Sequence, residues 1–190
     1  MKQPGVKQAV FAFLLYVGFE TTTIMWSGSY LVYAKAFTPD KAAFISSLFF
    51  IGITSSRIFT GFISSKAEDR TLIKGGIFLI LISCVLIMVL PKNFAPICLF
   101  LIGFGCGPIY PLMMHESATL FPKKYVTSII GYQSAFSYIG IITLPTLYGF
   151  IAKNIGQWLL PIYIFVFVLV ELINYCFKLK VSQKVINSNL

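Results

Sequence analysis

Long apolar segments alternate with short polar loops along most of the chain. A helix that crosses about 30 Å of hydrocarbon needs about 20 residues. Segments of that length predict six membrane-spanning helices, at about residues 7–33, 42–65, 72–90, 97–120, 126–152 and 158–177. The loops between them contain charges or proline, as in KAEDRT and FPKKY. We therefore expect an all-α, polytopic membrane protein whose residues 1–190 form a single six-helix membrane domain.

The composition supports a membrane protein and argues against other classes. Hydrophobic residues make up 57% of the chain and charged residues only 11%, whereas a soluble domain carries about 25% charged residues. The net charge of +9 does not indicate nucleic-acid binding, because the basic residues lie between apolar segments and form no patch. The four cysteines lie in or beside apolar segments without metal or redox spacing, so we expect them to pack as small hydrophobes.

The sequence carries no motif of an enzyme or of a cofactor site. It has no nucleophile motif, and its single histidine, His115, has no metal-ligating partner at a useful spacing. The glycines at 103–107 follow no strand, so they do not indicate a phosphate-binding loop. We therefore expect no enzymatic activity, no metal and no cofactor.

The distribution of basic residues predicts the orientation in the membrane. Ten basic residues lie on one side of the six spans and four on the other, while Arg57 lies inside a span. The larger group is Lys2, Lys7, Lys66, Arg70, Lys74, Lys123, Lys124, Lys178, Lys180 and Lys184, and the smaller group is Lys35, Lys41, Lys92 and Lys153. Because cytoplasmic loops hold the excess of lysine and arginine, we expect a multi-pass protein of the cell membrane with both termini in the cytoplasm.

An internal repeat appears at an offset of 88 residues, the difference between matching positions such as 52 and 140. Residues 51–53 read Ile-Gly-Ile, as do residues 139–141, and residues 61–63 read Gly-Phe-Ile, as do residues 149–151. The offset superposes the first three predicted helices on the last three. Because each copy has an odd number of spans, the copies must run in opposite directions, which predicts a 3+3 inverted repeat. Chance matches of glycine and isoleucine in apolar helices are the alternative.

Glu20 is the leading candidate for chemistry. It lies within the first apolar segment, and Tyr16, Thr23 and Ser27 fall on the same helical face. A carboxylate near the middle of a bilayer costs at least about 2.5–3.5 kcal/mol, so it should face a bundle interior or a wet cavity. There it could take up a proton on one side of the membrane and release it on the other. A structural glutamate held by neighbouring hydroxyls is the alternative.

The helices differ in character. The segments 72–90 and 158–177 are almost wholly apolar, whereas the other four carry hydroxyls, glycines and amides. We therefore expect those four to line a cavity and the two apolar segments to lie outside. The predicted substrate-binding residues are Glu20, Thr23, Trp26, Ser27, Tyr110, Gln133 and Ser137. The alternative is that the small residues serve close helix packing and that Trp26 belongs to the core.

The remaining charged residues fit gating or structural roles. Arg57, near the cytoplasmic end of its helix, could bind a substrate carboxylate, but it better fits a gate in which it pairs with Glu68 or Asp69 of the next loop. His115 and Glu116 lie at the inner end of the fourth segment, where a structural role is favoured over a proton relay. We interpret Glu171, on the outer sixth segment, as a packing or oligomer contact.

Several strings resemble the C-terminal half of a major facilitator superfamily transporter, in particular the fucose permease-like group. These are YVGFETTTIMW at 16–26, RIFTG at 57–61, GFGCGPIYP at 103–111 and SYIGIITLP at 137–145, which look like the family's seventh, eighth, tenth and eleventh helices. The chain departs from the family in having six helices instead of twelve, and KAEDR at 66–70 only approximates the family's loop motif.

The resemblance implies a secondary active transporter, with proton-coupled symport of a small polar solute such as a sugar. The implied partners are the lipid bilayer, the solute, and either an N-terminal six-helix half or a second copy of this chain. A non-transporting membrane partner or regulatory subunit, a truncated remnant of such a transporter, and a small channel remain as alternatives. The intramembrane acid and the repeat favour a transporter over a channel.

Overall fold

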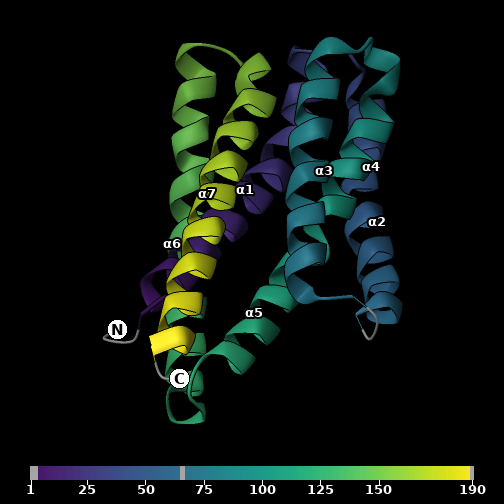
Figure 1. Cartoon of the computed structure of the whole chain (residues 1–190). Helices are drawn as coiled ribbons and strands as arrows, with labels where there is room; N and C mark the ends of the chain where they lie inside the picture. The colour runs from purple at the N-terminus through teal and green to yellow at the C-terminus, as the bar shows by residue number, and fades with distance from the viewer. Residues whose placement is uncertain (1–3, 65–66, 189–190) are drawn as a thin grey trace.

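A computed structural model describes residues 4–64 and 67–188, with side chains up to Lys178. The regular elements of these residues are helices: α1 (Val6–Tyr33), α2 (Pro39–Ile63), α3 (Asp69–Val89), η1 (Lys92–Phe94), α4 (Ala95–Cys106), α5 (Ile109–Leu120), α6 (Lys123–Asn154), η2 (Gln157–Leu159) and α7 (Leu160–Ser188). Six helical segments of the described chain are long and apolar enough to cross a membrane, which confirms the number predicted from the sequence. The beginning of α1 and the end of α7 lie at the same end of the bundle (Figure 1).

The fourth span is broken where the sequence predicted one continuous helix over 97–120. It consists of α4 and α5, which meet at Gly107 and Pro108 and run in visibly different directions (Figure 1). Pro108 and Pro111 lack the amide hydrogens that would bond to the carbonyls four residues earlier, and their rings crowd those carbonyls. The sixth span also differs from its expected range of 158–177, because α7 continues to Ser188.

The helix contacts reproduce the predicted repeat. Gly52 of α2 and Gly140 of α6 are 88 positions apart in the sequence, and both lie at close helix crossings. A Cβ at Gly52 would overlap the backbone carbonyl of Phe100 in the fourth span, and a Cβ at Gly140 would overlap that of Leu14 in the first. The second span therefore packs on the fourth as the fifth packs on the first. This is the relation that a 3+3 inverted repeat requires.

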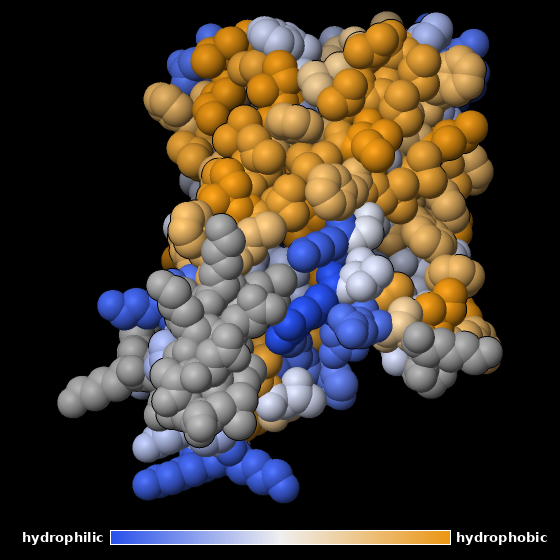
Figure 2. All heavy atoms as spheres, viewed as in Figure 1, coloured by the Kyte–Doolittle hydropathy of each residue, from blue (hydrophilic) through white to orange (hydrophobic). Residues whose placement is uncertain are grey.

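The two most apolar helices cover one side of the bundle. α3 packs against α4 and α5, α7 packs against α1, and α3 and α7 also contact each other. In the view of Figure 1 these two helices lie toward the viewer, and the same face carries a broad apolar band (Figure 2). Hydrophilic residues gather below this band, beside α5. The arrangement agrees with the expectation that the third and sixth spans lie outside the polar ones.

Candidate functional site

The break between α4 and α5 is tied to α1 by a tyrosine. Tyr16 is fully buried, and its hydroxyl lies 2.8 Å from the backbone carbonyl oxygen of Cys106, the last residue of α4. The same hydroxyl lies 3.0 Å from Oε1 of Glu20, one helical turn further along α1. The Tyr16 ring also packs edge-on against Phe19, with 5.3 Å between centroids. The contact of Tyr16 with Glu20 confirms that the two share a helical face.

The Tyr16 hydroxyl has more acceptors than hydrogens. A phenol carries one hydrogen, while the carbonyl of Cys106 and the carboxyl of Glu20 both lie within hydrogen-bonding distance. The carbonyl can only accept. Both contacts can be full hydrogen bonds only when the Glu20 carboxyl is protonated and donates to the Tyr16 oxygen.

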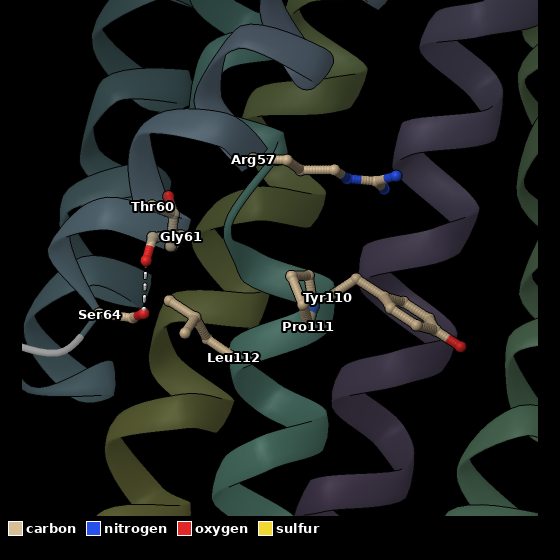
Figure 3. A pocket seen from close by; sticks show the side chains of 7 residues that line it. All are labelled: Arg57, Thr60, Gly61, Ser64, Tyr110, Pro111 and Leu112. Atoms are coloured by element: carbon tan, nitrogen blue, oxygen red, sulfur yellow. Dashed lines mark hydrogen bonds between the residues drawn. The ribbon is translucent and has the colours of Figure 1, made fainter.

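Arg57 of α2 provides a positive charge that acts on this pair. Its side chain extends from α2 toward α1 (Figure 3) and lies within electrostatic range of both Tyr16 and Glu20. Glu20 itself is partly buried. Among the described residues Arg57 forms no ion pair within 4.0 Å, so its guanidinium keeps donors for another acceptor.

A cavity of about 450 Å³ opens beside Arg57, between α2 and α5 (Figure 3). Its lining residues are Arg57, Thr60, Gly61, Ser64, Tyr110, Pro111 and Leu112. This volume lies within the roughly 300–1,000 Å³ of small-molecule pockets. Arg57, Gly61 and Pro111 are exposed, so the cavity is open at the surface. Its hydroxyl groups, its guanidinium and the Tyr110 ring can bind a small solute that has hydrogen-bond acceptors.

The cavity exists because α5 turns away from α2 after the break. Before the break, Gly103 of α4 lies against the backbone of Phe49 in α2. Beyond it, Gly61 of α2 has nothing within 4 Å of a would-be Cβ. Sequence reasoning missed Thr60, Gly61, Ser64, Pro111 and Leu112 as lining residues. The Gly-Pro-x-x-Pro pattern at 107–111 was the available signal, because two prolines three residues apart indicate a broken helix.

The predicted binding residues of α1 beyond Glu20 point elsewhere. The Thr23 hydroxyl donates to the backbone carbonyl of Phe19 at 2.8 Å, and both Thr23 and Ser27 are buried. The Trp26 indole nitrogen donates to the carbonyl of Pro145 at 3.1 Å, and its ring packs edge-on against Tyr148. Trp26 therefore ties α1 to α6, whereas the Thr23 hydroxyl is bonded within its own helix.

The predicted binding residues of α5 and α6 differ in what they contact: one lines the cavity and two bond within the bundle. Tyr110 of α5 lines the cavity and packs against Phe13, with 5.1 Å between ring centroids. Gln133 of α6 is buried and donates to the Ser117 hydroxyl of α5 at 2.8 Å. The Ser137 hydroxyl donates to the carbonyl of Ser134, within its own helix. Of the seven predicted residues, Tyr110 lines the cavity and Glu20 lies within range of Arg57, which lines it.

The charged residues near the end of the bundle pair differently from the predicted gate. Asp69 of α3 contacts the His115 ring of α5, and Glu68 precedes α3 in an exposed position. The expected pairing of Arg57 with either acid is therefore absent among the described residues. Asp69 instead belongs to a contact between α3 and α5.

A second cluster joins α3, α5 and α7. The buried carboxylate of Glu116 accepts from Lys178 at 2.7 Å and from Tyr175 at 3.3 Å, and Arg70 lies 3.5 Å away. Glu171 lies one helical turn before Tyr175 on α7. It is completely buried, and neither of its oxygens has a hydrogen-bond partner among the described residues. Glu171 was interpreted from the sequence as a packing or oligomer contact. The structure places it inside the chain.

Comparison with known proteins identifies the family. The family model described as Major Facilitator Superfamily matches residues 9–185. The crystal structure of a Major Facilitator Superfamily transporter, FucP, in the outward conformation is similar to this chain with a TM-score of 0.70. The two are 18% identical, and the match covers 92% of this chain and 41% of FucP. This likeness shows the fold, of which the chain forms a six-helix half.

A curated relative also matches most of this chain. Bypass of stop codon protein 6 of Saccharomyces cerevisiae is 27% identical over 173 residues, which are 85% of this chain and 35% of that protein. The chain thus spans about a third of that relative and two fifths of FucP. The family consists of membrane permeases, which agrees with the absence of enzyme motifs in the sequence. From its match over residues 9–185, the chain belongs to the Major Facilitator Superfamily.

Proposed function

We propose that this chain forms the C-terminal half of a secondary active transporter that carries a small polar solute, such as a sugar, together with a proton. The observation that carries the proposal is the position of Glu20. Its carboxyl group lies inside an apolar span, against Tyr16 and within range of Arg57, which lines the cavity. Ionisable residues in such positions are functional by default.

Proton binding and solute binding share the charge of Arg57. While Glu20 is ionised, it attracts the guanidinium and competes with any solute acceptor for it. When Glu20 takes up a proton, this competition ends, and Arg57 becomes available to a solute in the cavity. Thr60 and Ser64 of α2 add hydroxyl groups, and Tyr110 adds an aromatic face for the apolar side of a sugar.

The transporter also needs a second six-helix unit. Transporters of this architecture move by rocking one bundle against another around a site between them. The cavity beside Arg57 is open at the surface of this bundle, and hydrocarbon would leave its polar groups without partners. An N-terminal half is the partner that we propose, with a second copy of this chain as the alternative. We place the assembly in the cell membrane with both termini of this chain in the cytoplasm.

Uptake into proteoliposomes tests the proposal. The chain would be co-expressed with an N-terminal six-helix half of a family member, reconstituted, and offered labelled sugars with and without an inwardly directed proton gradient. The proposal predicts accumulation above the external concentration only when the gradient is present. The same chain without the added half is the control for self-pairing. Uptake that does not depend on the proton gradient would contradict symport. The absence of uptake both with and without the added half would contradict a transport function.

A further inference from the structure

We propose that Tyr16 is a positioning residue that passes the protonation state of Glu20 to the break between α4 and α5. When Glu20 is protonated, Tyr16 holds the Cys106 carbonyl and so holds the break against α1. When Glu20 is ionised, Tyr16 turns its hydrogen to the carboxylate and releases the carbonyl. This inference rests on the proposed function, since it takes Glu20 as the proton site.

The argument begins with the hydrogens available. The Tyr16 oxygen lies 2.8 Å from the Cys106 carbonyl oxygen and 3.0 Å from Glu20 Oε1, distances typical of two full hydrogen bonds. A protonated carboxyl supplies the second hydrogen, so that Glu20 donates to Tyr16 and Tyr16 donates to Cys106. An ionised carboxyl has no hydrogen to give, and a hydrogen bond to a charged acceptor is roughly twice as strong as one to a neutral carbonyl. The single phenolic hydrogen then goes to Glu20.

The Cys106 carbonyl lies at the break between α4 and α5, where regular helical hydrogen bonds are missing. Cys106 is the last residue of α4, and Gly107 and Pro108 separate it from α5. Pro108 and Pro111 remove two amide hydrogens from this turn. A contact from a neighbouring helix therefore has more influence on the direction of α5 here than it would in a regular helix. The same turn begins the wall of the cavity, because Tyr110, Pro111 and Leu112 line it.

Few other charged or titratable groups act on this pair. Arg57 of α2 is within electrostatic range of both residues. The Cys106 thiol of α4 lies near Tyr16, and Tyr110 of α5 lies 6.4 Å away between ring centroids. α6 and α7 also pack against α1, but within the described residues they contribute no titratable group that acts on Tyr16 or Glu20. Glu20 is therefore the group whose protonation can change the contact between Tyr16 and the break.

Distances between spin labels on α2 and α5 test the inference. The full chain, with its four native cysteines replaced by alanine, would carry Phe62→Cys and Ala118→Cys, both at exposed positions. Labels at these sites report the angle of α5 relative to α2. Measurements would be made in lipid nanodiscs with the co-expressed N-terminal half, across a range of pH.

The inference predicts a distance that changes with pH in the parent protein. Glu20→Gln should keep the low-pH distance at every pH, because the amide donates to Tyr16 as the protonated acid does. Tyr16→Phe should show the high-pH distance throughout, because no hydroxyl holds Cys106. Tyr30→Phe, a control on the same helix outside the site, should respond as the parent does.

The outcomes separate this inference from the function on which it rests. A Tyr16→Phe variant that keeps the parent's pH response would overturn the role of Tyr16, as would a parent distance that does not respond to pH. If Glu20→Gln abolishes the response while Tyr16→Phe preserves it, Glu20 remains the proton site and another residue transmits its state. If both variants preserve the response, Glu20 is not the proton site either.

Discussion

Lys178 of α7 and Glu116 of α5 form an ion pair of 2.7 Å that is almost completely removed from solvent, with 2% and 4% of the side chains exposed. The Lys178 ammonium also lies 5.5 Å from the centroid of the Tyr175 ring, one turn earlier on α7. Tyr175 donates to the other oxygen of the same carboxylate. The outer helix α7 is thus attached to α5, which is the half of the fourth span beyond the break.

Removing one partner of this pair should destabilise the chain strongly. Glu116→Gln leaves the Lys178 ammonium buried without its counter-charge, and breaking a buried pair costs about 3–5 kcal/mol. The double variant Glu116→Gln/Lys178→Met should recover a large part of that loss, because no buried charge is left unpaired. Thermal unfolding in detergent measures both, with exposed Lys123→Met as the control. A double variant less stable than both single variants would contradict the account.

Replacing Glu171 by methionine should stabilise the chain. Its carboxyl group is fully buried without a hydrogen-bond partner among the described residues, and such burial costs about 1–3 kcal/mol. Methionine has a similar length and no group to desolvate. The free energy of unfolding should rise by about that amount, whereas exposed Glu68→Gln should change it little. A loss of stability in Glu171→Met would show that the carboxyl has a partner in the membrane.

Side chains at the two repeat-related glycines should force their helices apart. Gly52→Val and Gly140→Val each place atoms where a neighbouring backbone carbonyl lies, and overpacking of this kind costs about 1–3 kcal/mol. Gly75→Ala is the matched control, because nothing lies within 4 Å of its would-be Cβ. The free energy of unfolding, measured for all three variants, should fall for Gly52→Val and Gly140→Val. It should stay the same or rise slightly for Gly75→Ala. Equal changes in the free energy of unfolding for Gly52→Val and Gly75→Ala would contradict a close helix crossing at Gly52.

The orientation in the membrane can be measured with single cysteines. Substitution at Lys35, Lys92 or Lys153 should allow labelling by a membrane-impermeant thiol reagent from outside the cell, because these positions lie on the side with few basic residues. Substitution at Lys123 should block labelling until the membrane is permeabilised. The reverse pattern would place both termini outside.

The hydrophobic pattern predicted the spans because a membrane allows few backbone conformations. Every backbone polar group in hydrocarbon must be bonded within the chain, so each apolar segment of sufficient length is a helix. The repeat was also visible, because Gly52 and Gly140 are needed at equivalent crossings. The shared face of Tyr16 and Glu20 followed from helical spacing alone.

The cavity and the ion pairs could not be obtained in the same way. Both depend on the direction that α5 takes after Gly107 and Pro108, which two prolines permit without fixing its angle. That direction brings Asp69 to His115 rather than to Arg57. Periodicity also does not distinguish a hydroxyl that binds a solute from one that donates to a carbonyl of its own helix, as Thr23 does, because threonine suits both roles.

Solute accumulation by a Glu20→Gln variant tests the central claim most directly. The variant and the parent chain, each with the N-terminal half, would be compared in proteoliposomes for accumulation driven by a proton gradient and for exchange of labelled solute without one. The account predicts that Glu20→Gln loses accumulation while retaining exchange, because the amide cannot bind and release a proton but leaves Arg57 and the cavity in place. Accumulation by Glu20→Gln at the parent's level would contradict a proton-coupling role for Glu20.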